Sequence, residues 1–136
     1  MKKYIIDTNA LISYVTDRNP EQQKKIAPLF QAVADNKACM ICHQNVLTEF
    51  IYVMDKNYLL PKHEIRKIIN DFIEMRGIEI IHETDFNTVL SYWPDHISDF
   101  GDAIIASLSK IKKVPIVTFD RKFSDQLKTL GLILWV

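Results

Sequence analysis

Short apolar segments alternate with longer amphipathic segments along the chain, and this alternation limits its possible folds more than any other feature. Several apolar segments lack a polar alternation, which is typical of strands covered on both faces. Helices between successive strands favour parallel pairing through crossover connections. The sequence therefore predicts an α/β fold, a three-layer α/β/α sandwich on a mainly parallel sheet of about five strands. We predict these strands at residues 3–7, 38–43, 78–82, 114–120 and 132–136.

The amphipathic segments carry apolar residues at helical spacing. The clearest of them begins at Pro61, has a stripe that includes Ile65 and Phe72, and ends at Gly77. The chain of 136 residues is long enough for one domain with its own core, so we expect a single domain over residues 1–136. We predict helices at residues 20–36, 46–58, 61–77, 84–93, 101–113 and 121–131.

Charge and hydropathy exclude several classes of protein. The chain has 17 basic and 17 acidic residues, so it is not a strongly basic nucleic-acid coat protein, although a local patch can still bind nucleic acid. Its apolar runs are too short to span a membrane. The N-terminal segment is interrupted by polar residues and lacks a small-residue cleavage site. We therefore expect a cytoplasmic protein that does not associate with membranes.

Acidic residues follow the predicted strands or begin the helices beside them. Asp7 and Asp120 end the first and fourth strands, Asp99 and Asp102 open the helix before the fourth, and Glu49 lies beside the buried face of the helix after the second. Because ligands gather at the carboxyl ends of parallel strands, we expect these side chains to lie close together. Clustered carboxylates repel one another unless protons or cations intervene, and oxygen ligands favour Mg²⁺ or Mn²⁺.

Each of these acids also has a purely structural interpretation. Asp7 and Asp99 could cap helices, Asp120 could belong to a turn, and Glu49 could pair with a lysine. The residues alone leave both interpretations open.

Two short patterns suggest other functions but lack the necessary context. Residues 99–101 read "DFG", as in the magnesium loop of kinases, but the chain is too short for two lobes and has no Gly-rich phosphate loop. Residues 39–43 read "CMICH", which matches a haem-attachment pattern. In a strand, however, Cys39 and Cys42 would point to opposite faces, and no export signal is present. We therefore predict neither a kinase nor a bound haem.

A phosphoacceptor receiver domain is an alternative of similar size and architecture. It requires an Asp after the third strand and a Lys after the fifth. This sequence has His82 at the end of the third predicted strand and no Lys after the fifth. These differences argue against a receiver domain.

Four segments, "IIDTNALIS" (5–13), "LTEF" (47–50), "DFGDAIIAS" (99–107) and "VTFDRKF" (117–123), occur in this order over nearly the whole chain. On these segments the sequence resembles the PIN-domain ribonucleases, in particular the VapC-type toxins of toxin–antitoxin pairs. The resemblance implies a catalytic, metal-binding quartet and auxiliary residues that support it. The quartet would be Asp7, Glu49, Asp102 and Asp120, and the auxiliary residues Asn9, Thr118 and Asp99.

The resemblance also implies a function and partners. The chain would cleave RNA with Mg²⁺ or Mn²⁺, leave 5′-phosphate and 3′-hydroxyl ends, form a homodimer and bind an antitoxin. Many relatives have a small or polar loop after the last motif, where this chain has Arg121 and Lys122, so we expect these two to contact RNA phosphate. Two alternatives remain, an RNA-processing nuclease outside a toxin pair and a catalytically inactive interaction module. We expect the antitoxin to use basic residues against the acids and apolar anchors against the early helices, at Leu29, Phe30, Phe50 and Met54.

Overall fold

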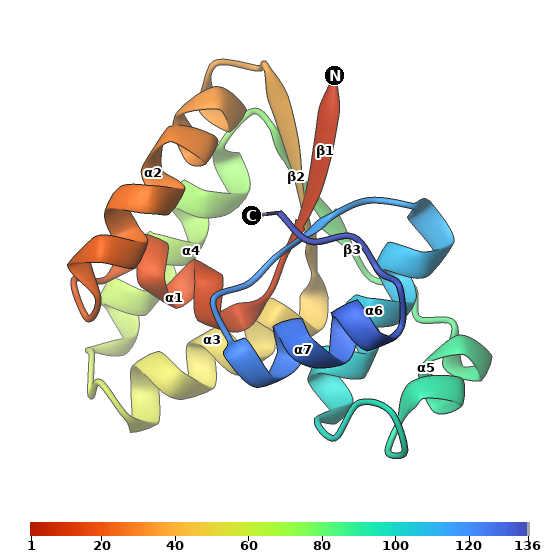
Figure 1. The fold of residues 1–136 in the computed structure, drawn as a ribbon. Coiled ribbons are helices and arrows are strands. Elements are labelled where there is room, and N and C mark those ends of the chain that lie inside the picture. The colour runs from red at the N-terminus through yellow and green to blue at the C-terminus, as the bar shows by residue number, and fades with distance from the viewer. Residues whose placement is uncertain (136) are drawn as a thin grey trace.

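The computed structural model describes residues 1–135, in which strands and helices alternate (Figure 1). The strands are β1 (Lys2–Ile6), β2 (Ala38–His43), β3 (Ile78–Ile81) and β4 (Ile116–Val117). The helices are α1 (Thr8–Val15), α2 (Pro20–Ala34), α3 (Gln44–Lys56), α4 (Lys62–Glu74), α5 (Phe86–Tyr92), α6 (Phe100–Lys112) and α7 (Arg121–Thr129). None of the helices in these residues is both long and apolar enough to cross a membrane.

The four strands form one sheet in the order β3-β2-β1-β4, and every pair is parallel. In Figure 1, α1, α2 and α4 lie on the left of the sheet, while α5 and α6 lie on its right. The predicted α/β fold with a parallel sheet between helices is therefore confirmed. The central strand β1 is covered on both faces, and Ile5 and Ile6 have no exposed surface.

Within residues 132–135, the described part of the predicted fifth strand, the pairing is reduced to a single bridge at the edge of β4. Leu134 pairs with Ile116 in the parallel sense, and the Trp135 N–H donates to the Ile116 carbonyl at 2.9 Å. The expected count of about five strands is thus approximately right. Val136, the last residue of the predicted strand, lies outside the described residues.

Helix α1 was not among the predicted helices. Asp7 alone separates it from β1, and the Asp7 carboxylate caps it by accepting a hydrogen bond from the Ala10 N–H at 2.8 Å. Its residues Ala10, Leu11 and Ile12 are consecutive and all buried, so the apolar residues do not follow the spacing of an amphipathic helix. Tertiary burial, which the local pattern does not reveal, accounts for this helix.

The residues that we expected to anchor a partner belong instead to the core. Phe50 and Met54 of α3 have no exposed surface, and Leu29 and Phe30 of α2 are 8% and 1% exposed. The expectation that they offer an apolar docking surface is wrong. The apolar stripes of α2 and α3 face the protein interior, where they pack into one cluster with β1 and β2.

Replacement of Phe50 by Ala should lower the free energy of unfolding by about 3–5 kcal/mol, because it leaves a cavity in a close-packed core. Tyr52, on the same helix, is 63% exposed, so Tyr52→Ala should change it by no more than about 0.5 kcal/mol. Urea denaturation of both variants measures the difference. Equal effects would contradict the placement of Phe50 in the core.

Candidate functional site

Among the helices that begin at the carboxyl edge of the sheet, α1, α6 and α7 are each capped by an aspartate of the predicted site. Asp7 follows β1 and caps α1, Asp99 caps α6, and Asp120 follows β4 and caps α7. Each of these carboxylates accepts a hydrogen bond from a backbone N–H three residues further on. Asp102 lies in the first turn of α6, and Glu49 projects from α3. The three aspartates therefore do cap helices, and this structural role does not exclude a second role in a site.

Asp7 is the most buried of these acids, with 3% of its surface exposed. Its Oδ1 is used by the cap, whereas Oδ2 is buried and has no hydrogen-bond partner among residues 1–135. Burial raises its pKa from 3.8 to about 6. The Thr118 side chain and the Ala10 N–H lower this pKa, but by smaller amounts. The charges of Asp120 and Glu49 raise it further. A buried carboxylate oxygen without a donor is a costly feature in a purely structural residue.

Asp102 has the largest pKa shift among the acids of this edge. Burial raises its pKa from 3.8 to about 8, together with the negative charges of Asp99, Asp7, Asp120 and Glu49. All four acids are therefore close enough to Asp102 to affect its ionisation. We call these five residues the acidic cluster.

Glu49 is held in this cluster by two neighbours from different elements. The Thr8 hydroxyl of α1 donates to Glu49 Oε1 at 2.9 Å, and Asn45 Nδ2, one turn earlier on α3, donates to the same oxygen at 3.3 Å. Gly101 at the start of α6 allows the carboxylate to approach, since a Cβ there would lie 2.9 and 3.0 Å from the two carboxylate oxygens. The pKa of Glu49 is raised by burial and by the charge of Asp99.

Thr8, Asn45 and Gly101 are residues that the sequence analysis missed. Asn45 could have been found, because it lies four residues before Glu49 on the same helix and such residues are neighbours on its surface. The contacts of Thr8 and Gly101 join segments far apart in the chain and have no local signal. The glycine of the "DFG" triplet thus has a steric role in this fold.

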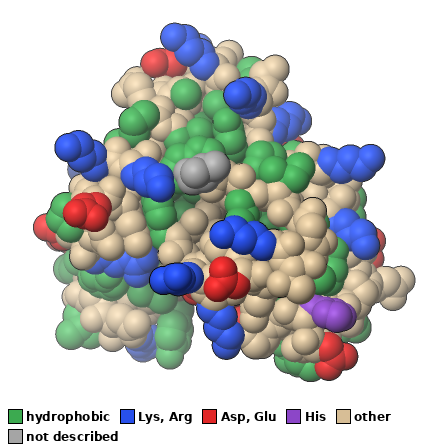
Figure 2. Space-filling view, in the orientation of Figure 1, with side chains coloured by type: hydrophobic (Ala, Val, Ile, Leu, Met, Phe, Trp, Pro, Cys, Tyr) green, Lys and Arg blue, Asp and Glu red, His purple; other side chains and the backbone are tan. Residues whose placement is uncertain are grey.

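Two of the auxiliary residues, Thr118 and Asn9, lie near Asp120. The Thr118 hydroxyl accepts a hydrogen bond from the Asp120 N–H at 3.0 Å. Asn9 and Asp120 line a small cavity of about 190 Å³. Arg121 and Lys122 are exposed in the first turn of α7, and Lys and Arg side chains are spread over the surface around α7 (Figure 2). Asp99 is exposed, and its charge acts on both Asp102 and Glu49.

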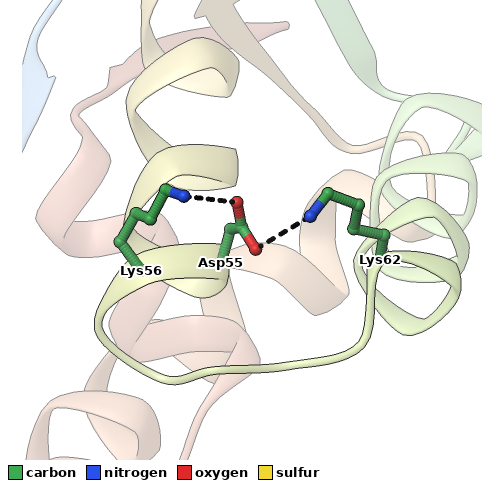
Figure 3. A network of polar contacts seen from close by, with 3 residues as sticks. All are labelled: Asp55, Lys56 and Lys62. Atoms are coloured by element: carbon green, nitrogen blue, oxygen red, sulfur yellow. Dashed lines mark hydrogen bonds and ion pairs between the residues drawn. The ribbon is translucent and has the colours of Figure 1, made fainter.

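No lysine or arginine neutralises the acidic cluster within residues 1–135. The two ion pairs in this part of the chain both involve Asp55, with Lys56 at 3.7 Å and Lys62 at 3.4 Å (Figure 3). Within these residues, therefore, no lysine forms an ion pair with Glu49, which was the structural alternative for this residue. The charges of the cluster are offset only by hydrogen bonds, by helix N-termini and by protonation.

The chemistry of these groups fits a hard divalent cation. The donors are carboxylate oxygens, one of them the unpaired Asp7 Oδ2, and such oxygens are the ligands of Mg²⁺ and Mn²⁺. As the side chains are arranged, no three His, Cys, Asp or Glu residues in the described part of the chain lie close enough to hold one ion together. Coordination would require them to move closer to one another.

The two cysteines of the haem-like pattern lie in different environments. Cys42 is fully buried, and burial raises its pKa to about 12. Cys39 is partly exposed, and its Sγ lies 3.8 Å from a carboxylate oxygen of Glu79 on the neighbouring strand. They do not form a common site.

Comparison with known proteins identifies the family of this chain. The family model of the PIN domain matches residues 4–126. No curated protein sequence matches the chain. Among solved structures, VapC20 of Mycobacterium tuberculosis, described as a toxin that cleaves the sarcin-ricin loop, is similar with a TM-score of 0.70, 14% identity and 96% of each chain covered.

Two further similar structures come from other bacteria. VapBC2 of Rickettsia felis, bound to a DNA fragment from its promoter, has a TM-score of 0.69 and 19% identity over 98% of this chain and 97% of the other. FitAcB of Neisseria gonorrhoeae has a TM-score of 0.65 and 14% identity over 98% and 96%. At such identities these likenesses concern the fold.

The metal-free protein should become less stable as the pH rises from about 4 to about 8. Folding raises the pKa values of Asp7 and Asp102 from 3.8 to about 6 and about 8. At a pH between 3.8 and these raised values, the folded state binds more protons than the unfolded chain, so the free energy of unfolding falls as the pH rises. Asp102→Asn should remove most of the decline between pH 6 and 8. Thermal melts in EDTA across this pH range measure it, and an equally steep decline in the variant would contradict the assignment.

Proposed function

Since this chain belongs to the PIN domain family, we propose that it is a divalent-metal-dependent endoribonuclease and the toxin of a toxin–antitoxin pair. The observation that carries the proposal is the acidic cluster, whose carboxylates lie at the carboxyl edge of the sheet without a lysine or arginine partner among residues 1–135. An uncompensated group of this kind suits a site that binds cations and a substrate with phosphate groups.

In this proposal Asp7, Glu49, Asp102 and Asp120 hold Mg²⁺ or Mn²⁺. A bound divalent cation supplies an activated water and offsets the charge of the phosphodiester under attack. The protein's own groups keep the ligands in place: Thr8 and Asn45 orient the Glu49 carboxylate, and helix capping orients Asp7 and Asp120. Asp99 and Asn9 support the site from its rim, and Thr118 does so from beside Asp120.

Exposed basic residues beside the cluster support RNA as the substrate. Arg121 and Lys122 follow Asp120 directly, so their charges lie next to the site without neutralising it. We assign them contacts with RNA phosphates, which bind Lys and Arg by charge and hydrogen bonds. The family resemblance implies products with 5′-phosphate and 3′-hydroxyl ends.

The likeness to VapBC and FitAB structures favours a protein partner that restrains the enzyme. A basic residue of an antitoxin could pair with the acidic cluster and displace the cations. Since the expected anchors on α2 and α3 are buried, its apolar residues would need another surface. The groove of about 340 Å³ between α3 and α4, lined by Ile51, Ile65 and Ile69, offers one. The resemblance to VapC-type toxins also favours a homodimer that acts in the cytoplasm.

Purified protein should cleave total RNA with Mg²⁺ or Mn²⁺ and lose this activity in EDTA. Asp7→Asn should reduce cleavage by at least about 100-fold, while its amide oxygen can still cap α1. Asp125→Asn, which removes an exposed acid of α7 outside the cluster, should cleave normally. Gel analysis of the products and mapping of their ends measure the outcome. Cleavage that persists in EDTA, or that survives Asp7→Asn, would contradict the proposal.

Expression of the chain alone should stop bacterial growth, and co-expression of the adjacent gene should restore it. Asp7→Asn should be harmless and should still form the complex, because it removes one charge contact worth about 1–3 kcal/mol. Growth curves and co-purification test both points. A harmless wild-type chain that binds no neighbouring gene product would favour an RNA-processing nuclease outside a toxin pair, and an inactive chain would favour an interaction module.

A further inference from the structure

Arg18, in the segment between α1 and α2, is held by hydrogen bonds to α1 and lies near Asp120 of the acidic cluster. Its Nη2 donates to the Asn9 carbonyl at 2.9 Å and to Ser13 Oγ at 3.1 Å, and its Nε also lies within reach of Ser13 Oγ at 3.3 Å. Ser13 is buried and donates in turn to Gln22 Oε1 at 2.7 Å. The guanidinium is therefore positioned by α1 and, through Ser13, by α2, although the residue itself is exposed.

Arg18 lines the same small cavity as Asp120. This open cavity of about 190 Å³ is lined by Asn9, Arg18, Gln22, Phe119 and Asp120. Despite this proximity, Arg18 forms no ion pair within residues 1–135, where both ion pairs involve Asp55. Its Nη1 has no hydrogen-bond partner in that part of the chain either. A positioned cation with an unused donor nitrogen thus belongs to a cavity that Asp120 of the acidic cluster also lines.

A phosphate group is the ligand that this arrangement fits. Guanidinium is always charged, and the Nη1 of Arg18 keeps N–H groups that can donate charge-assisted hydrogen bonds to a phosphate oxygen. An RNA strand that reaches the acidic cluster brings several phosphates near negative side chains, and each of these phosphates is repelled unless a cation lies close to it. Arg18 lies on the α1 side of Asp120, whereas Arg121 and Lys122 lie on α7.

We propose that Arg18 binds the RNA phosphate next to the one that is cleaved and so fixes the position of the strand. The inference rests on the proposed function, because it assigns a substrate contact at the same site. Arg18 is a binding residue that lies outside the metal-holding quartet. Its loss should therefore weaken substrate binding and leave the chemical step intact.

Steady-state cleavage of a mixed-sequence single-stranded RNA tests this role. Arg18→Gln should raise KM by about tenfold or more, the loss expected for a charge-assisted hydrogen bond, with kcat unchanged. Arg18→Lys should recover part of the loss, since it keeps the charge without the planar donors. Arg76→Gln, which removes an exposed arginine just after α4, serves as the matched control and should cleave like the wild type.

Equilibrium binding of the same RNA in the Asp7→Asn background separates binding from cleavage. There Arg18→Gln should lower the slope of log Kd against log salt by about one, and Arg76→Gln should leave it unchanged. An Arg18→Gln variant with normal KM and normal salt slope, even if it melts at a lower temperature, would overturn the inference and leave only a role in holding the loop. If the wild type cleaves no RNA and does not bind it, the proposed function fails together with this inference.

Discussion

Repulsion among the carboxylates at the carboxyl edge of the sheet is the constraint on which the rest of the site depends. Asp102 has its pKa raised to about 8 by burial and by the four neighbouring acids. The N-terminal N–H groups of α1, α6 and α7, which begin at the same edge, favour negative charge and offset part of this cost. The same interactions that cap α1, α6 and α7 therefore gather the acids that repel one another.

The acidic residues of this protein differ in whether a basic side chain pairs with them. Asp55, at the end of α3, is paired with Lys56 and Lys62 (Figure 3), so its charge is offset within the fold. The acidic cluster has no such partner within residues 1–135, and the nearby Arg18 and Arg121 leave it unpaired. A negative centre with positive residues at its rim suits a site that receives both cations and a polyanionic strand. This contrast distinguishes a site that needs a ligand from a surface that is already neutral.

Most of the fold could be predicted from local patterns. Strand β2 lies where the apolar run placed it, and α4 and α6 differ from the predicted helices by only a few residues at their ends. The failures arose where tertiary contacts override the local signal. Helix α1 is so buried that it has no polar stripe, and among the described residues 132–135 of the predicted last strand only Leu134 forms a bridge to β4. Leu29 and Phe50 looked like docking residues because a stripe on a helix does not reveal which surface covers it.

The sequence by itself determined the order of the strands and helices and the placement of acids at strand ends and helix starts, since both depend on residue type and spacing over a few positions. Only the tertiary structure decided which segments meet there. The contact of Thr8 with Glu49 spans 41 residues, and the closeness of Gly101 to Glu49 joins α6 to α3. The structure also decided that Asp7, Asp99 and Asp120 cap helices while they crowd one another, because pKa shifts and unpaired charges arise from distances in space that no local spacing encodes.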